Sequence, residues 1–204
     1  MTDTTSERQQ LRARIAGQRQ ALGAAERMRA AQGLRRSLEQ LPEFLVDERI
    51  AGYWAHAGEL PLNLAMAPMA ERGQQFHLPV IGADRRLHFA AWQAGDAVEP
   101  NRYGIPEPAI RDRLLPGNFM DVVLVPLLGF DRRGNRLGFG GGYYDTSFAF
   151  LKNETRPASP LLVGIGYAFQ ELDALDAEPW DISLDYVATE RELIDCTAPE
   201  ESPA

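Results

Sequence analysis

The segment "GNRLGFGGGYYD" (134–145) contains the residues whose types and spacing point most directly to chemistry. Four of its five glycines stand close together at 138, 140, 141 and 142, with Arg136 before them and Asp145 after them. Glycine lets successive backbone N–H groups turn toward one point and lets an anion approach closely. Arg136 can add a full positive charge, and Asp145 can hold a cation that phosphates bring. The pattern favours a phosphate-binding loop; the alternative is a flexible turn in which Asp145 caps a helix.

Two common phosphate motifs do not match this segment. The P-loop requires a Gly-Lys pair, and the sequence contains none. A dinucleotide fingerprint starting at Gly138 would need its third glycine at Tyr143. The loop nevertheless comes after the apolar run 121–128 and before a helix expected over about 143–152. Ligands of α/β proteins bind at the carboxyl ends of strands, and a helix N-terminus favours anions.

Alternating elements are expected to position this loop. Apolar spacing predicts helices, and short apolar or alternating runs predict strands. The expected helices cover 6–22, 24–41 and 60–73, and the expected strands cover 49–55, 74–80, 86–92, 121–128, 161–168 and 184–190. Pro and Gly make 99–108 a loop. The alternation predicts an α/β fold with a largely parallel sheet, as one domain over 1–196 with a disordered tail over 197–204.

Composition narrows the partners and the location. A formal net charge of −8 argues against general nucleic-acid binding. One cysteine, Cys196, allows no intramolecular disulfide, which suits a reducing compartment. Neither a signal-peptide pattern nor an apolar run of membrane-spanning length is found, so we expect a cytoplasmic protein with no membrane partner. The three histidines share no ligand spacing, so no zinc is expected.

The stretch "VPLLGFDRRGNRLGFGGGYYD" (125–145) closely resembles the signature of the 5-formyltetrahydrofolate cyclo-ligase (5,10-methenyltetrahydrofolate synthetase) family. Similar segments extend the match to about 8–190 and are "RQQLR" (8–12), "HLPV" (77–80), "NRYGIPEP" (101–108) and "FQELDALDAEPWDISLDYVATE" (169–190). The resemblance implies a three-layer α/β/α domain of the sugar-phosphate isomerase and CoA-transferase type. It also implies an ATP-dependent cyclisation of 5-formyltetrahydrofolate to 5,10-methenyltetrahydrofolate with Mg²⁺. ADP and phosphate are released after phosphorylation of the formyl oxygen, and the enzyme is expected to act as a monomer.

The same resemblance implies roles for individual residues. The ATP phosphates would be wrapped by Arg136, Leu137, Gly138, Phe139, Gly140, Gly141, Gly142, Tyr143 and Tyr144, with Arg8 and Arg12 contacting ATP from one helix face. Asp145 and Asp181 would ligate Mg²⁺. Trp54 and Glu59 would contact the folate. Tyr143 would also contact the folate near its formyl group, and Tyr143 and Arg136 would be catalytic.

From the residues alone, plainer interpretations stay open for several of these positions. Arg8 and Arg12 also fit a solvated basic face, and Asp181 also fits a turn or helix cap. Trp54 also fits core packing, and Glu59 also fits charge pairing at a helix start.

Two departures from the family pattern and two rival functions remain at this stage. Phe139 and Gly141 stand where some members carry basic residues. Gln74 stands where Lys is frequent, which leaves open how a folate's glutamate tail is held. One rival is a sugar-phosphate isomerase, whose reaction would not depend on ATP. The other is a non-catalytic folate- or nucleotide-binding module.

Overall fold

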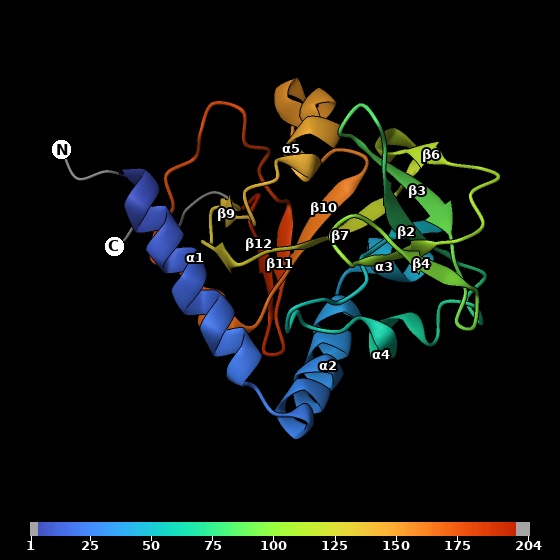
Figure 1. Ribbon diagram of the computed structural model, residues 1–204, viewed down its shortest axis with the longest axis horizontal. Helices are drawn as coiled ribbons and strands as arrows, with labels where there is room; N and C mark the ends of the chain where they lie inside the picture. Colours follow the sequence, from blue (N-terminus) through green and yellow to red (C-terminus); the bar gives the residue numbers. More distant parts are fainter. Residues whose placement is uncertain (1–3, 199–204) are drawn as a thin grey trace.

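An eight-stranded sheet forms the centre of the computed structural model, which describes residues 4–198 (Figure 1). The strands lie in the order β12-β11-β10-β7-β1-β2-β3-β6. Their bounds are β1 (Arg49–Ala51), β2 (Gln75–Ile81), β3 (Leu87–Ala91), β6 (Leu115–Pro116), β7 (Val122–Pro126), β10 (Leu161–Ile165), β11 (Tyr186–Ala188) and β12 (Leu193–Asp195). The five strands from β11 to β2 run parallel, while β12 pairs antiparallel with β11, and β3 pairs antiparallel with both β2 and the edge strand β6. The predicted mostly parallel α/β fold is confirmed.

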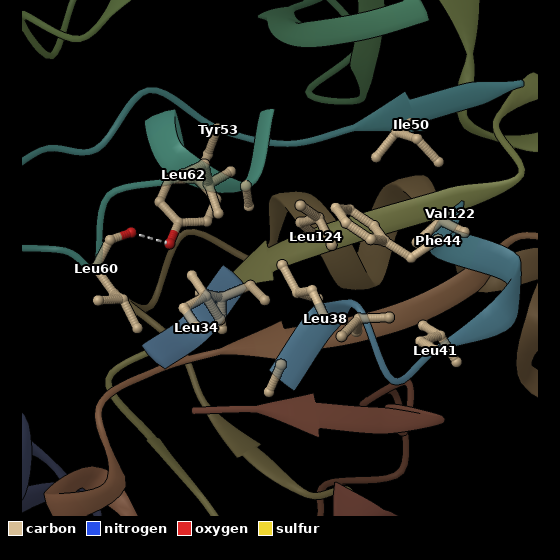
Figure 2. Packing of buried hydrophobic residues seen from close by; sticks show 14 of the residues in the cluster. Leu34, Leu38, Leu41, Phe44, Ile50, Tyr53, Leu60, Leu62, Val122 and Leu124 are labelled. Carbon is tan, nitrogen blue, oxygen red and sulfur yellow. Dashed lines mark hydrogen bonds between the residues drawn. The ribbon is translucent and has the colours of Figure 1, made fainter. Parts of the chain in front are cut away.

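Helices cover both faces of this sheet because its central strands are apolar on both sides. In β7 successive side chains point to opposite faces, and Val122, Val123, Leu124 and Val125 are all buried. One face packs against α2 (Ala24–Leu38), α3 (Pro42–Val46) and α4 (Asn63–Met66), as Figure 2 shows for residues from α2 and α3. The other face packs against α5 (Tyr143–Ser147) and the 3₁₀ helix η2 (Ala149–Asn153) through Phe148 and Leu151. This gives the expected three layers.

The first helix, α1 (Thr4–Ala21), does not join either layer. Its Ile15 packs with Leu128, Leu137 and Leu175 in a small separate cluster. Those partners belong to segments that follow the carboxyl ends of β7 and β10, including the hairpin of β8 (Gly129–Phe130) and β9 (Arg136–Leu137). Figure 1 shows α1 along one side of the molecule, beside β9. α1 is therefore placed next to the ends of the central strands, where ligands bind in α/β folds.

Several local predictions were wrong in extent. The helix expected over 60–73 is the single turn α4, flanked by Pro61 and Pro68, which restrict helix formation around them. The helix expected over 143–152 is divided at Phe148 between α5 and η2. The expected loop 99–108 contains a hairpin of β4 (Val98–Pro100) and β5 (Pro106–Pro108).

Other elements were missed. The helix α3, the strand β12 and the β8–β9 hairpin had no predicted counterpart, so the glycine loop follows that hairpin rather than the buried strand directly. Most of the expected tail 197–204 lies outside the described residues. Within 4–198 no helix combines the length and apolar character needed to cross a bilayer.

Candidate active site

A cavity of about 680 Å³ lies at the carboxyl ends of β1, β2 and β7. Its size is typical of a small-molecule site. Every residue predicted for the site contributes to its lining, namely Arg8, Arg12, Trp54, Glu59, Arg136, Leu137, Gly138, Phe139, Gly140, Gly141, Gly142, Tyr143, Tyr144, Asp145 and Asp181. The structure thus brings together residues spread over most of the chain, while their individual roles stay predictions.

The glycine loop leaves free space on its cavity side. Gly140 and Gly142 have φ values of +91° and +67°, a left-handed conformation that other residues rarely adopt. Gly138 has no such φ, and a Cβ added there would have no atom within 4 Å. Neither backbone strain nor packing within the described protein therefore requires glycine at 138. The space beside Gly138 is open, and Gly138 lines the cavity, so that space is available to a ligand.

Arg136 is buried and already paired. Its side chain is 7% exposed, one Nη donates to Asp145 Oδ1, and the other donates to the carbonyl oxygen of Ile182. The N–H of Ile182 also donates to Asp145 Oδ1, over 3.2 Å. Burial lowers the pKa of Arg136, and the negative charges of Asp145 and Asp181 oppose that shift. Arg136 thus ties the glycine loop to the segment around Asp181 instead of projecting freely toward a phosphate.

The two predicted metal carboxylates fit a cation that arrives with other ligands. Within the described range no group of three or more His, Cys, Asp or Glu side chains could hold a metal ion by itself. Asp181 accepts the N–H of Glu178 at Oδ2, over 2.9 Å. The negative charges of Asp145 and Asp181 both raise the pKa of Arg136, and both residues line the cavity, so the two carboxylates lie in the same part of it. Mg²⁺ is commonly held by one or two carboxylates together with substrate phosphates and water.

Three arginines on α1 tie the helix to the cavity walls. Arg12 Nε donates to Gly138 O over 2.9 Å, and Arg8 Nη1 contacts Glu178 Oε1 at 3.3 Å. Arg19, which was not predicted for the site, is 1% exposed and donates to Ala57 O over 3.0 Å. Its guanidinium carbon lies 5.2 Å from the centre of the Phe139 ring. α1 therefore contacts the 54–59 segment, the glycine loop and the 176–181 segment in turn.

The wall that was predicted to contact folate combines an aromatic pair with a buried carboxyl group. Trp54 packs edge to face on Trp92, with ring centres 5.5 Å apart. Glu59 accepts the N–H of His56 over 2.9 Å. Burial raises the pKa of Glu59 to about 7, although that hydrogen bond and Arg19 act in the opposite direction. No helix begins at Glu59, since α4 starts at Asn63, so pairing with a helix end does not explain this residue.

The β4–β5 hairpin supplies contacts to the glycine loop that the sequence analysis missed. Arg102 donates to the Tyr143 hydroxyl over 2.6 Å, and the Tyr103 hydroxyl lies 2.7 Å from the same oxygen. The hydrogen bond with Tyr103, followed by that with Arg102, lowers the pKa of Tyr143. Arg85, in the turn between β2 and β3, donates to Gly141 O over 3.2 Å. The resemblance of "NRYGIPEP" was the available signal, but no residue in it was assigned a role.

Gln74, in contrast, lies away from the cavity. It precedes β2, at the opposite end of the strand from the cavity, and its Nε2 donates to the carbonyls of Phe44 and Asp47 over 2.9 and 2.7 Å. The absence of a lysine there consequently does not alter the cavity's charge. Positive charge at the cavity comes from arginines instead.

Fold and cavity together define an α/β domain with a ligand site at the carboxyl ends of its central strands. The model of the 5-formyltetrahydrofolate cyclo-ligase family matches residues 4–190, so the chain belongs to this family of enzymes. The 5-formyltetrahydrofolate cyclo-ligase of Haemophilus influenzae is 31% identical over 183 residues, covering 88% of this chain and 96% of the relative. The Escherichia coli protein of the same name is 31% identical over 179 residues, covering 86% and 96%.

Solved structures agree with this assignment. The 5,10-methenyltetrahydrofolate synthetase of Aquifex aeolicus superimposes with a TM-score of 0.78 at 26% identity, covering 97% of this chain and 96% of that one. The synthetase of Mycoplasma pneumoniae gives a TM-score of 0.69 at 26% identity, covering 90% and 98%. The relatives are named for a substrate and the structures for a product. Together the names indicate conversion of 5-formyltetrahydrofolate to 5,10-methenyltetrahydrofolate, and the resemblance found in the sequence is confirmed.

Proposed function

We propose that this protein cyclises 5-formyltetrahydrofolate to 5,10-methenyltetrahydrofolate at the expense of ATP, in the presence of Mg²⁺. One observation carries the proposal: the open glycine loop and the Trp54–Glu59 wall line the same cavity. A triphosphate and a folate can therefore meet within it. The proposal also includes that the enzyme is monomeric and cytoplasmic. Gel filtration tests the first point, and cell fractionation tests the second.

The formyl oxygen is a poor leaving group, so the reaction first converts it into a phosphate ester, from which phosphate leaves readily. The formyl oxygen attacks the γ-phosphorus and ADP leaves. N10 of the folate then attacks the formyl carbon and loses its proton, and the C–O bond to phosphate breaks. No protein nucleophile takes part, so positioning and charge neutralisation are the enzyme's main contributions.

The residues of the cavity suit these tasks. Backbone N–H groups near Gly138 to Gly142 and the cation of Arg12 can neutralise phosphate oxygens. Bound Mg²⁺ would offset further phosphate charge, with Asp145 and Asp181 as its protein ligands. The Tyr143 hydroxyl, polarised by Arg102, can donate to the former formyl oxygen as it leaves the carbon with phosphate. Glu59 is suited to exchanging a proton with the folate ring because its pKa lies near neutrality.

The decisive experiment follows the methenyl product by its absorbance. Purified protein is mixed with 5-formyltetrahydrofolate and Mg-ATP, with ATP omitted in the control. We expect product only with ATP, together with release of phosphate. Tyr143→Phe should lower kcat at least about tenfold because it removes one directed hydrogen bond in the transition state. Tyr186→Phe, on β11 and outside the cavity, is the matched control and should retain wild-type kcat.

Each rival predicts a different result. An isomerase on this fold would act on a sugar phosphate with no need for ATP. A binding module would bind ATP or folate in saturable fashion without releasing phosphate. Absence of product in the presence of both substrates and Mg²⁺ would overturn the proposal.

A further inference from the structure

Trp180 is an exposed tryptophan at the rim of the cavity. It is 64% exposed and lines the cavity between Glu178 and Asp181. An indole left in water forgoes the large gain that burying its apolar surface would bring. Its exposure beside a ligand site therefore calls for a physical explanation.

The exposure does not come from a loose segment. The Asp181 N–H donates to Glu178 O over 3.0 Å, and the Glu178 N–H donates to Asp181 Oδ2 over 2.9 Å, so the turn is closed in both directions. Pro179 stands at the second turn position, which it favours. Lys152, the only lysine of the chain, donates to the carbonyl of Pro179. The fold thus holds Trp180 in a fixed turn while leaving its ring in solvent.

The contacts of α1 order the parts of the cavity along one line. Arg19 contacts Ala57 in the wall containing Trp54 and Glu59 and also lies over Phe139 of the glycine loop. Arg12 contacts Gly138 of the same loop, and Arg8 contacts Glu178 in the Trp180 turn. At 1.5 Å per helical residue, Arg12 lies about 10 Å from Arg19 and about 6 Å from Arg8 along the axis. The glycine loop therefore stands between the wall and the turn of Trp180.

We infer that Trp180 is the platform on which the purine base of the nucleotide stacks. This inference rests on the proposed function, in which the γ-phosphate faces the folate. The ribose and base must then extend from the glycine loop away from Trp54 and Glu59, and Trp180 lines the cavity beside Glu178 on that side. Stacking on an aromatic side chain is a general way for proteins to hold a nucleobase.

Nucleotide binding without folate tests the inference directly. Calorimetry of wild type, Trp180→Ala and Trp180→Phe uses two probes, Mg-ATP and inorganic tripolyphosphate. For Trp180→Ala we expect the Kd of ATP to rise about tenfold, equivalent to about 1.4 kcal/mol, with the Kd of tripolyphosphate unchanged. Trp180→Phe keeps an aromatic ring, so it should lose less affinity. Phe119→Ala is the matched control, because Phe119 is 49% exposed and lies outside the cavity.

Indole fluorescence gives an independent readout. ATP should quench the emission of the wild type, and this quenching should disappear in Trp180→Phe while ATP still binds. The residues Trp54 and Trp92 would continue to emit in that variant. Thermal melting should be the same in both Trp180 variants and the wild type, because the ring is exposed.

The possible failures are distinguishable. Equal ATP affinity in wild type and Trp180→Ala would overturn the stacking inference and leave the proposed function intact. Equal weakening of ATP and tripolyphosphate would also overturn it, since the effect would then be on phosphate binding. A wild-type protein that binds neither probe would contradict the proposed function itself.

Discussion

Replacement of Glu59 by glutamine should make the protein more stable and less active at pH 8. Burial raises the pKa of this carboxyl group from 4.5 to about 7 in the folded state. The folded protein therefore binds the proton more tightly than the unfolded chain. The contribution of Glu59 to stability is complete below pH 4.5, declines between pH 4.5 and 7, and is absent above that range. A shift of this size corresponds to about 3 kcal/mol.

Glutamine avoids the cost of the buried charge and keeps an oxygen that can accept the His56 N–H. In a chain of this length 1 kcal/mol shifts Tm by roughly 2–4 °C. We therefore expect Glu59→Gln to melt about 6–12 °C above the wild type at pH 8, with the difference vanishing near pH 4.5. Turnover should fall, because an amide cannot exchange a proton at neutral pH.

The assay is a series of thermal melts from pH 4 to 8, with turnover measured on the same samples. Glu71→Gln is the control, since Glu71 is exposed and outside the cavity, and it should leave both quantities unchanged. Equal Tm values for wild type and Glu59→Gln at pH 8 would refute the argument from burial. Full turnover in Glu59→Gln would refute the proposed proton exchange.

Three further predictions concern the glycine loop, the two carboxylates proposed to bind Mg²⁺, and the β8–β9 hairpin that precedes the glycine loop. Gly138→Ala should change stability by less than about 1 kcal/mol because its Cβ enters open space, but it should raise the Kd of ATP about tenfold in calorimetry. Gly17→Ala, whose Cβ also enters open space, is the control. Unchanged ATP affinity in Gly138→Ala would contradict the argument that a ligand occupies this space. Asp181→Asn should lower kcat at limiting Mg²⁺ without changing Tm. Asp145→Asn should lower kcat as well and should reduce the free energy of unfolding by about 3 kcal/mol, because it leaves Arg136 without its carboxylate. Full activity of Asp181→Asn would exclude Asp181 from the proposed metal site. Burial alone would raise the pKa of Asp131, but hydrogen bonds from Asn135, Leu175 and Arg133 outweigh burial and lower that pKa. The ionised Asp131 therefore stabilises the fold above pH 3.8, and this stabilisation is lost as the pH falls through the pKa of the folded state. Asp131→Asn should accordingly reduce stability at pH 7 and weaken its acid dependence in denaturant melts, and an unchanged acid profile would count against this network.

The sequence predicted the elements whose signals are local. The apolar run of β7 indicated a strand buried on both faces because its side chains from Val122 to Val125 face packed layers on alternate sides. The helix expected over 60–73 failed because spacing alone cannot show that Pro61 and Pro68 confine the chain to one turn. The strands β8 and β12 are two and three residues long, and neither forms an apolar or alternating run of its own in the sequence.

The same distinction applies to the site. The glycines and Asp145 were found because their types and order are visible in the sequence, whereas Asp181 was assigned only through the family resemblance. Arg19 was passed over although it follows Arg12 by two helical turns, because its burial depends on Ala57 and Leu127, which only the folded chain brings near. Tyr103 was missed for the same reason, since its partner Tyr143 belongs to another loop.

The packing of α1 also determines when, during synthesis, the protein can form its complete ligand cavity. α1 is synthesised before its apolar partners Leu128, Leu137 and Leu175, which lie more than a hundred residues further along the sequence. Until they have been made and folded, Ile15 has no cluster to enter and Arg12 has no loop carbonyl to meet. The cavity is therefore completed in a late step, and a ligand that needs its full lining stabilises only chains that extend beyond Asp181. Ligand-dependent protection of the first helix from proteolysis would distinguish complete molecules from truncated ones.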